Sequence, residues 1–175
     1  MTESSAEDLY QKLLDASFHF VSFRPRSEKE IRAYLVKKLS RSSVIPADSS
    51  VIPAKAGIQF SNSPLIERVI TRLRELDYVN DEKFAAWWVD QRQSHKPKGM
   101  RLLTHELKAK GVTVEMKQSD EVGLARQALV KKLDRWQALP KLEQKTKIYG
   151  FLGRRGFDAD TIRRVIDEVV LRKVQ

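Results

Sequence analysis

The sequence predicts an all-α fold, made of three tandem three-helix repeats that form an elongated, curved molecule. Apolar residues recur at helical spacing along nearly the whole chain, which favours helices over strands. A helix-ending pattern of apolar residues and bases, with glycine in two of its three copies, also recurs about every 45–50 residues. Such recurrence is typical of helical-repeat proteins, which offer an extended surface instead of one deep pocket. The three copies of the pattern span 31–38, 103–112 and 148–157.

The composition narrows the possible classes of protein. The chain has 175 residues and a formal net charge of +10, so we expect its partner to be a polyanion or an acidic surface. It has no cysteine, which excludes disulfides and thiolate metal sites. Its longest apolar runs fall far below the ~20 residues that span a bilayer, and its first residues are acidic, unlike a signal peptide. We therefore expect a cytoplasmic protein that makes no membrane contact.

The first repeat is expected at 9–79. The spacing of leucine and phenylalanine predicts a first helix over 9–20. Residues 27–30, with the sequence SEKE, have the pattern of a capping box, so a second helix should begin there and run to about Leu39. Ser63-Pro64 predicts the start of a third helix, with the serine as cap and the proline in the first turn.

The second repeat is expected at 80–119 and the third at 120–175. Acidic residues after Asn80 predict a helix start, because they lie at the positive end of the helix dipole. Gly111 and Gly156 each follow a helical stretch and predict left-handed helix ends. With a short turn near 114–118, the pattern gives nine helical elements in three groups of three. The remaining helices are expected over about 100–110, 120–137, 140–156 and 158–172.

An insertion interrupts the first repeat. Leu35 and Ile66 lie 31 residues apart, whereas the corresponding Leu152 and Ile162 lie 10 apart, and the excess of 21 falls on Ser42–Asn62. This stretch contains two similar heptads and no helical or strand period, so we expect a loop or a disordered segment. Two origins stay open: a peptide encoded by a mobile repeat element, or an ordinary low-complexity loop. Its low charge and lack of a regular face argue against a binding role.

Residues with catalytic or metal-binding patterns are absent from the sequence. No glycine loop of the form GxxxxGKS occurs, and His105-Glu106 lacks the second histidine of a zinc-protease motif because position 109 is alanine. The three histidines do not share a metal-ligand spacing. We therefore expect no catalytic residue, no metal site and no cofactor, and His105 is interpreted as a solvent-facing helix residue.

Basic clusters are the positive signal for function. Residues 18–41 and 91–111 each carry a net charge of +5, and the third repeat adds a further group of arginines. For any single base a solvated helix face is the more ordinary explanation, but clusters at corresponding repeat positions favour one continuous positive face. We expect these bases to be exposed and to contribute little to stability. The candidate partner-binding or DNA-binding residues are Arg24, Arg26, Arg32, Arg92, Lys98, Arg101, Lys108, Lys110, Arg154 and Arg155.

Tryptophan and glycine give weaker signals. Trp87 and Trp88 are neighbours on a predicted helix and point about 100° apart, so core packing is expected for at least one of them. An exposed tryptophan there would favour a protein interface. Gly150 and Gly153 lie inside a predicted helix, where each costs about 1 kcal/mol relative to alanine. We expect close helix packing to compensate.

Four motifs, taken in order, resemble the bacterial RecX family, which regulates the RecA recombinase. They are SEKEI at 27–31, LDYVNDEKFA at 76–85, the stretch 99–112 with its EL and KGV elements, and 151–157 with its RGF element. The resemblance covers about 15–172 apart from the insertion. It implies three tandem three-helix units that bind in the helical groove of the RecA–DNA filament. The positions that match the family pattern are Arg24, Ser27, Arg32, Asp81, Arg92, Gly99, Lys110 and Arg155.

The resemblance also implies what the protein does. Family members block the RecA ATPase and strand exchange, limit filament growth, and bind single-stranded and double-stranded DNA weakly, so recombination and the SOS response are the expected context. The chain departs from the family at Leu102, where a base is usual, and a contact there could be shifted or lost.

The main hypothesis is therefore a non-enzymatic, monomeric regulator of RecA filaments. The alternative is a basic helical protein that binds nucleic acid through the same face without RecA. A third class, a small hydrolase, has no supporting group of residues.

Overall fold

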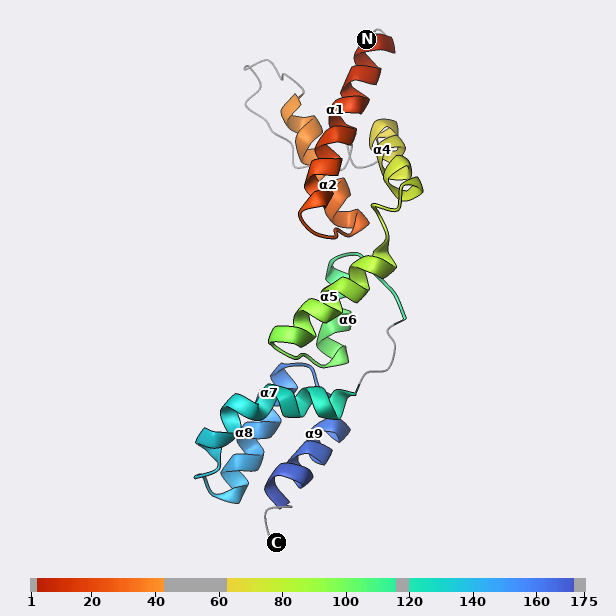
Figure 1. The fold of residues 1–175 in the computed structure, drawn as a ribbon. Coiled ribbons are helices and arrows are strands. Elements are labelled where there is room, and N and C mark those ends of the chain that lie inside the picture. Colours follow the sequence, from red (N-terminus) through yellow and green to blue (C-terminus); the bar gives the residue numbers. More distant parts are fainter. Residues whose placement is uncertain (1–2, 43–62, 116–119, 172–175) are drawn as a thin grey trace. The chain divides into compact units, whose positions relative to one another are not determined.

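A computed structural model describes residues 3–42, 63–115 and 120–171 of the chain. Within these ranges the chain forms eight α-helices and a short π-helical turn, and no strand (Figure 1). This confirms the predicted all-α class and its tandem helical character. Contacts divide the chain into two compact units, 1–84 and 85–175, so the second and third predicted repeats lie largely within one unit. The three repeat boundaries themselves stay a prediction.

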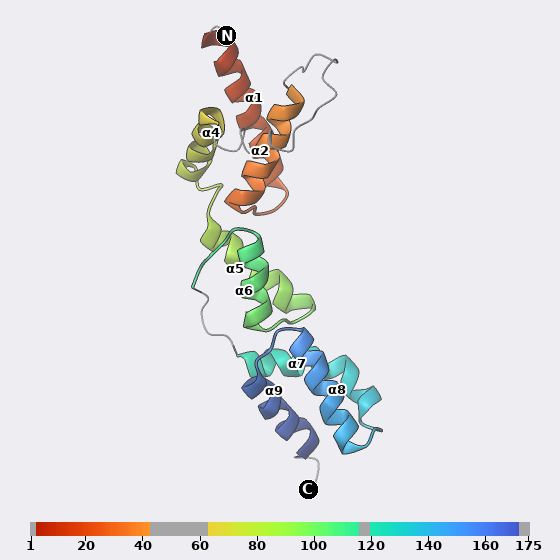
Figure 2. The ribbon, with the colours of Figure 1, turned by 180° about the vertical axis from the view of Figure 1, so that it is seen from behind.

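Three helices form the first unit, and both views show them packed together (Figures 1 and 2). The serine half of the predicted capping box is present at the start of the second helix, since the Glu30 N–H donates to Ser27 Oγ at 3.3 Å. Ser63 does occupy the N-cap position of the next helix, but its side chain makes no capping hydrogen bond. Apolar side chains from all three helices, such as Leu13, Leu35 and Ile70, are buried in one core. The helices are α1 (Glu3–Ser22), α2 (Glu28–Ser42) and α4 (Pro64–Glu75).

Almost all of the predicted insertion lies outside the described residues. Ser42 is the last residue of α2, and the remaining insertion residues, 43–62, lie outside the described residues. The loop or disordered state of this stretch therefore stays a prediction from its sequence.

The second predicted repeat contributes α5 (Asp81–His95) and α6 (Met100–Ala109). Asn80 caps α5, because its Oδ1 accepts a hydrogen bond from the Lys83 N–H at 3.0 Å. Gly111 ends α6 with φ of 79°, which confirms the predicted left-handed end. The third element expected here is not helical over 113–115, and 116–119 lie outside the described part of the chain. The described chain therefore shows eight α-helices where nine helical elements were expected.

The last three α-helices surround a second core. Asp120 caps the first of them by accepting from the Gly123 N–H at 2.9 Å, and Asp158 caps the last by accepting from the Thr161 N–H at 2.8 Å. Leu129, Leu152 and Val165 are fully buried between them. The helices are α7 (Glu121–Trp136), α8 (Lys141–Arg154) and α9 (Ala159–Ile166), and a π-helical turn (Asp167–Leu171) follows.

Within the second unit, the α5–α6 loop contacts the turn between α8 and α9. The Gly99 N–H donates to the Arg155 carbonyl oxygen at 2.9 Å. A Cβ atom at Gly99 would overlap the carbonyl oxygen of Gly156, and a Cβ at Gly156 would overlap Leu102. Gly156 also has φ of 83°, as expected for a left-handed helix end. Glycine is therefore required at both positions, because the two main chains approach more closely than a side chain permits.

The two glycines inside α8 have a different environment from the one expected. A Cβ at Gly153 would meet nothing within 4 Å, and one at Gly150 would meet only the Arg154 guanidinium, at 3.4 Å. The expectation that close helix packing compensates for these glycines is therefore wrong. Neither residue is required by a contact among the described residues.

We expect Gly153→Ala to stabilise the protein by about 1 kcal/mol, because alanine restricts the unfolded chain and favours helix without a clash. Thermal unfolding followed by circular dichroism should show a melting temperature roughly 2–4 °C higher. A melting temperature equal to or below that of the unchanged protein would mean that Gly153 makes a close contact in solution.

Candidate functional site

The first basic cluster is built around the turn between α1 and α2. Arg24 donates to Glu30 Oε1 at 3.1 Å and to the Pro25 carbonyl oxygen at 2.9 Å. The Arg26 guanidinium lies 4.1 Å from the centre of the Phe20 ring, and its burial, with the nearby charge of Arg24, lowers its pKa. Both arginines are half-buried, so their side chains hold this turn as well as face solvent.

Arg32 bridges α2 and α4 through two carboxylates. Its Nε donates to Glu28 Oε1 at 2.8 Å and its Nη2 donates to Glu67 Oε2 at 2.8 Å. The Glu67 hydrogen bond, opposed by burial and aided by Glu28, raises the pKa of Arg32. Glu28 also accepts from Arg74 Nε at 3.1 Å. The expected exposure does not hold for Arg32, because its side chain is 26 % exposed and links two core helices, and its contribution to stability stays a prediction.

In the second unit, Glu106 of α6 collects three donors. Trp88 Nε1 and Arg92 Nε, both on α5, donate to Glu106 Oε2 at 3.0 and 3.1 Å, and Lys98 Nζ donates to Oε1. Burial alone would raise the pKa of Glu106, but the hydrogen bonds from Lys98 and Trp88 and the nearby positive charges hold it below its ordinary value. Two predicted binding residues, Arg92 and Lys98, therefore have an internal carboxylate partner.

Both tryptophans of α5 are half-buried, so the expectation of core packing for at least one of them stays a prediction. Their rings meet edge to face with centres 6.2 Å apart. The Arg92 guanidinium lies 4.3 Å from the centre of the Trp88 ring, and Lys110 Nζ lies 5.4 Å from it. Lys110, another predicted binding residue, thus belongs to the same cluster.

Arg155 lies at the contact between the α5–α6 loop and the α8–α9 turn. Its Nη1 donates to the Pro97 carbonyl oxygen at 3.0 Å, and its guanidinium lies 4.7 Å from the centre of the Phe151 ring. Burial lowers its pKa. Its hydrogen bond to Pro97 shows that Arg155 joins the α8–α9 turn to the α5–α6 loop.

Carboxylates complete the contact at the start of α7. The Met100 N–H donates to Glu121 Oε1 at 2.5 Å, and burial raises the pKa of Glu121 despite that bond, with Asp158 adding to the effect. Hydrogen bonds from Thr161, chiefly from its hydroxyl group, lower the pKa of Asp158 to about 2. These groups tie α6, α7 and α9 together.

Three predicted binding residues are exposed: Arg101, Lys108 and Arg154. Arg101 and Lys108 are seven residues apart on α6, so they lie on the same face of that helix, two turns apart. The opposite face of α6 buries Leu103 and Leu107. Leu102, where the family resemblance led us to expect a base, is half-buried over Gly156.

The predicted positive face is thus divided into two kinds of base. Arg24, Arg32, Arg92, Lys98 and Arg155 hold internal contacts, whereas the exposed bases of α6 and α8 present their charge to solvent. The carboxylates that make this division were not among the residues predicted from the sequence. Glu28 lies four residues before Arg32 and could have been found as a helix pair. Glu67 and Glu106 could not, because only the packing of the helices brings them to their arginines.

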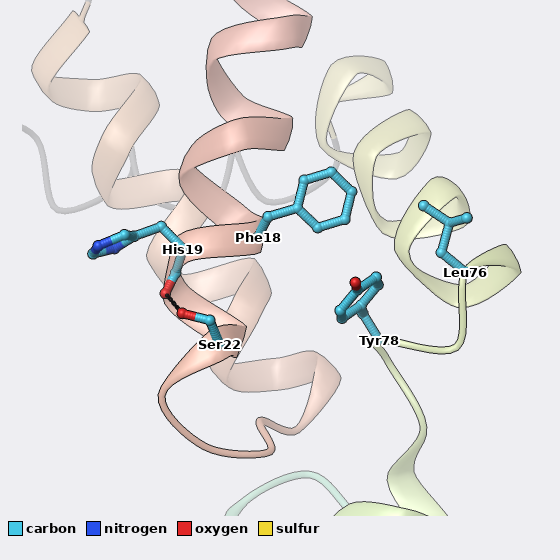
Figure 3. Close-up of a pocket in the computed structure, with 5 residues that line it drawn as sticks. All are labelled: Phe18, His19, Ser22, Leu76 and Tyr78. Carbon is cyan, nitrogen blue, oxygen red and sulfur yellow. Dashed lines mark hydrogen bonds between the residues drawn. The ribbon is translucent and has the colours of Figure 1, made fainter.

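One shallow depression lies on the first unit (Figure 3). It is lined by Phe18, His19, Ser22, Leu76 and Tyr78, and the rings of Phe18 and Tyr78 meet edge to face with centres 5.2 Å apart. Ser22 Oγ donates to the His19 carbonyl oxygen at 2.9 Å, so this hydroxyl is engaged with the main chain and not with an imidazole. The arrangement provides no nucleophile and base pair.

The described ranges show neither a metal-binding group of side chains nor a membrane-spanning helix. No group of three or more histidine, cysteine, aspartate or glutamate side chains there is arranged to hold a metal ion. In the same part of the chain, every helix is too short or too polar to cross a membrane.

Family models match two consecutive segments of the chain. The second three-helix domain of RecX matches 80–116, and the third three-helix domain of RecX matches 119–166. The first of these segments holds the Glu106 cluster and the exposed bases of α6, and the second holds α7, α8 and α9.

Curated relatives extend the likeness over most of the chain. A regulatory protein RecX of Mycobacterium sp. (strain JLS) is 32 % identical over 145 residues, which cover 76 % of this chain and 78 % of that protein. A regulatory protein RecX of Bacillus subtilis (strain 168) is 29 % identical over 170 residues. The chain spans 56 % of the length of that Bacillus protein.

A solved structure of RecX from Lactobacillus salivarius has a similar fold. The two chains superpose with a TM-score of 0.66 at 22 % identity, covering 94 % of this chain and 99 % of the other. The likeness supports the tandem helical fold described above.

Proposed function

Because this chain belongs to the RecX family of regulatory proteins, we propose that it binds RecA–DNA filaments and lowers RecA activity without catalysing a reaction of its own. The inhibited activities would be ATP hydrolysis, filament extension and strand exchange. The protein would act as a monomer in the cytoplasm, where the filament forms. It would need no cofactor.

The exposed bases of α6 support this proposal and indicate which surface contacts the filament. Arg101 and Lys108 are both exposed on one face of α6, in the segment that matches the second RecX domain. A charged helix face of this kind fits a phosphate-rich or acidic groove, since complementary charge steers association and sets the register of the bound surfaces. We assign this face the principal electrostatic contact with the filament.

The test is the DNA-dependent ATPase of RecA on single-stranded DNA. Adding the protein well below the RecA concentration should lower the rate of ATP hydrolysis. Reversing Arg101 and Lys108 to glutamate should raise the concentration needed for half-inhibition roughly tenfold, because two reversed contacts of about 0.5–1 kcal/mol each amount to one decade of affinity. Circular dichroism serves as the folding control.

The matched control reverses Lys131 and Arg135, which are exposed four residues apart on α7 and carry the same total charge. This variant should inhibit almost as well as the unchanged protein. Equal losses from both pairs of reversals would show that net charge alone drives binding. No inhibition by folded protein at equimolar RecA would reject the proposed function.

A second candidate function is nucleic-acid binding without RecA, which the net charge of +10 favours. It predicts binding to naked DNA that weakens steeply with salt and ignores sequence, with inhibition only when the protein covers the DNA. Inhibition at protein amounts far below the number of DNA sites would separate the two candidates.

A further inference from the structure

The Glu106 cluster is a cationic site whose anion is supplied by the protein itself. Arg92 and Lys98 converge on the two oxygens of one carboxylate, and Lys110 lies over the neighbouring Trp88 ring. Two positive side chains therefore share a single carboxylate, and a third positive side chain lies over the neighbouring tryptophan. An ion-binding arrangement with this surplus can accept a further anion, or exchange its internal anion for an external one.

The cluster is partly open to solvent. The side chain of Arg92 is 39 % exposed, that of Lys98 is 22 % exposed and that of Glu106 is 20 % exposed. The ion pairs are therefore weakened by water on one side but are less screened than pairs at a fully exposed surface. An incoming anion can reach the cations without unfolding the helix pair.

Arg92 has a second support that does not depend on Glu106. Its guanidinium lies 4.3 Å from the centre of the Trp88 ring, within the range of a cation–π interaction. If Glu106 lost its charge, this contact would still hold Arg92 near its present position. Neutralising Glu106 is therefore expected to free the positive charges of Arg92 and Lys98, while the arrangement of the cluster is kept.

We propose that Glu106 is an internal counter-ion that a phosphate group of single-stranded DNA displaces, so that Arg92 and Lys98 bind DNA only when they release this carboxylate. This proposal rests on the proposed function, because it assumes that the protein meets single-stranded DNA within the RecA filament. The phosphate oxygens take over the hydrogen bonds that Arg92 and Lys98 now donate to Glu106. Glu106 keeps its hydrogen bond from Trp88 Nε1, while its bonds from the two cations are broken.

A nucleic acid fits this cluster better than an acidic protein segment does. Arginine and lysine grouped around a half-buried tryptophan, with Arg92 over its ring, supply the positive charge and the arginine–aromatic contact that single-strand binding surfaces use. An acidic protein segment would use only ion pairs with Arg92 and Lys98, and would make no use of the tryptophan.

The test compares Glu106→Gln with Glu143→Gln. The amide keeps an acceptor for Trp88 Nε1 but removes the negative charge, and Glu143, an exposed residue in the first turn of α8, gives the same charge change outside the cluster. The full-length protein is titrated onto a fluorescent thirty-nucleotide oligothymidine at several salt concentrations, without RecA. We expect E106Q to bind three- to tenfold more tightly at low salt and E143Q to change affinity less than twofold.

The salt dependence gives an independent readout. If two cations gain phosphate contacts, the slope of log affinity against log salt should steepen by about 0.7 for each contact. Lys98→Gln should reverse the gain when it is combined with E106Q, because it removes one of the released cations. A purely structural role for Glu106 would lower the melting temperature of E106Q and leave the slope unchanged.

Three results would overturn the proposal. One is equal affinity and slope for E106Q and the unchanged protein, with both shown to be folded. Another is a gain that E143Q shares. The third is tighter binding of E106Q to RecA filaments but not to oligothymidine, which would assign the displaced contact to a protein carboxylate. The oligothymidine measurement contains no RecA, so a negative result there would not reject the proposed inhibition of RecA. In the same way, if the protein did not inhibit RecA, the binding of E106Q to oligothymidine could still be interpreted.

Discussion

Replacing Gly156 with alanine should destabilise the second unit by about 2–5 kcal/mol. The left-handed backbone costs a residue with a side chain about 1–2 kcal/mol, and forcing the Cβ against Leu102 adds an overpacking cost of about 1–3 kcal/mol. The melting temperature should fall by roughly 5–15 °C. Because Gly156 N–H and the neighbouring Arg155 carbonyl both lie in the turn that meets Gly99, the contact between α5–α6 and α8–α9 should loosen first.

Tryptophan fluorescence makes this measurement specific. All three tryptophans of the chain, Trp87, Trp88 and Trp136, lie in the second unit, so their emission reports its unfolding. Gly153→Ala is the matched control, because the same substitution three residues earlier in the chain meets no atom within 4 Å and should raise stability. If G156A and G153A shifted the fluorescence transition in the same direction, the close approach at Gly156 would be refuted.

Reversing Arg32 to glutamate should destabilise the first unit by about 2–3 kcal/mol. The variant loses charge-assisted hydrogen bonds to Glu28 and Glu67 and leaves three carboxylates facing one another between α2 and α4. The effect should stay below the 3–5 kcal/mol typical of a broken buried pair, because the Arg32 side chain is 26 % exposed. Hydrogen exchange followed by mass spectrometry should show faster exchange in both helices.

Arg72→Glu provides the comparison for this variant. Arg72 lies on α4 and pairs only within that helix among the described ion pairs, with Glu75 three residues away, and both side chains are about half exposed. Its reversal should leave the exchange of α2 unchanged, since exposed pairs contribute little. Equal exchange in R32E and R72E would show that the bridge between the helices carries no stability. A loss of filament binding in R32E is interpretable only after this control.

The helices and their ends could be predicted because they depend on residues close together in the sequence. The Ser27 cap and the left-handed glycines Gly111 and Gly156 each act within about one helical turn, and all are present. Ser63 lies at the N-cap position, as predicted, but its side chain makes no capping hydrogen bond. A serine at the N-cap can adopt a side-chain rotamer that does not form this bond. The family motifs, likewise, could be recognised from their order along the chain.

The candidate site was predicted less completely. The sequence located the basic clusters, but it could not separate bases that face solvent from bases that hold the fold. Arg101 and Lys108 could have been placed together from their spacing on α6 alone. Glu67 lies 35 residues from Arg32, and Glu106 lies 14 residues from Arg92, so no local pattern connects them.

Local spacing and composition were enough to predict the helical class, the helix ends, the family and the sign of the charge. Which cations have internal partners, and which glycines are required by contact, follows only from the packing of the helices. Gly99 and Gly156 show the reason: one lies at a helix start and the other at a helix end, and only the approach of two main chains excludes a Cβ atom at Gly99. Gly153, equally plausible in the sequence as a packing glycine, has no neighbour within 4 Å. Ion pairs and close contacts between segments depend on how helices dock, and docking is set by the whole core.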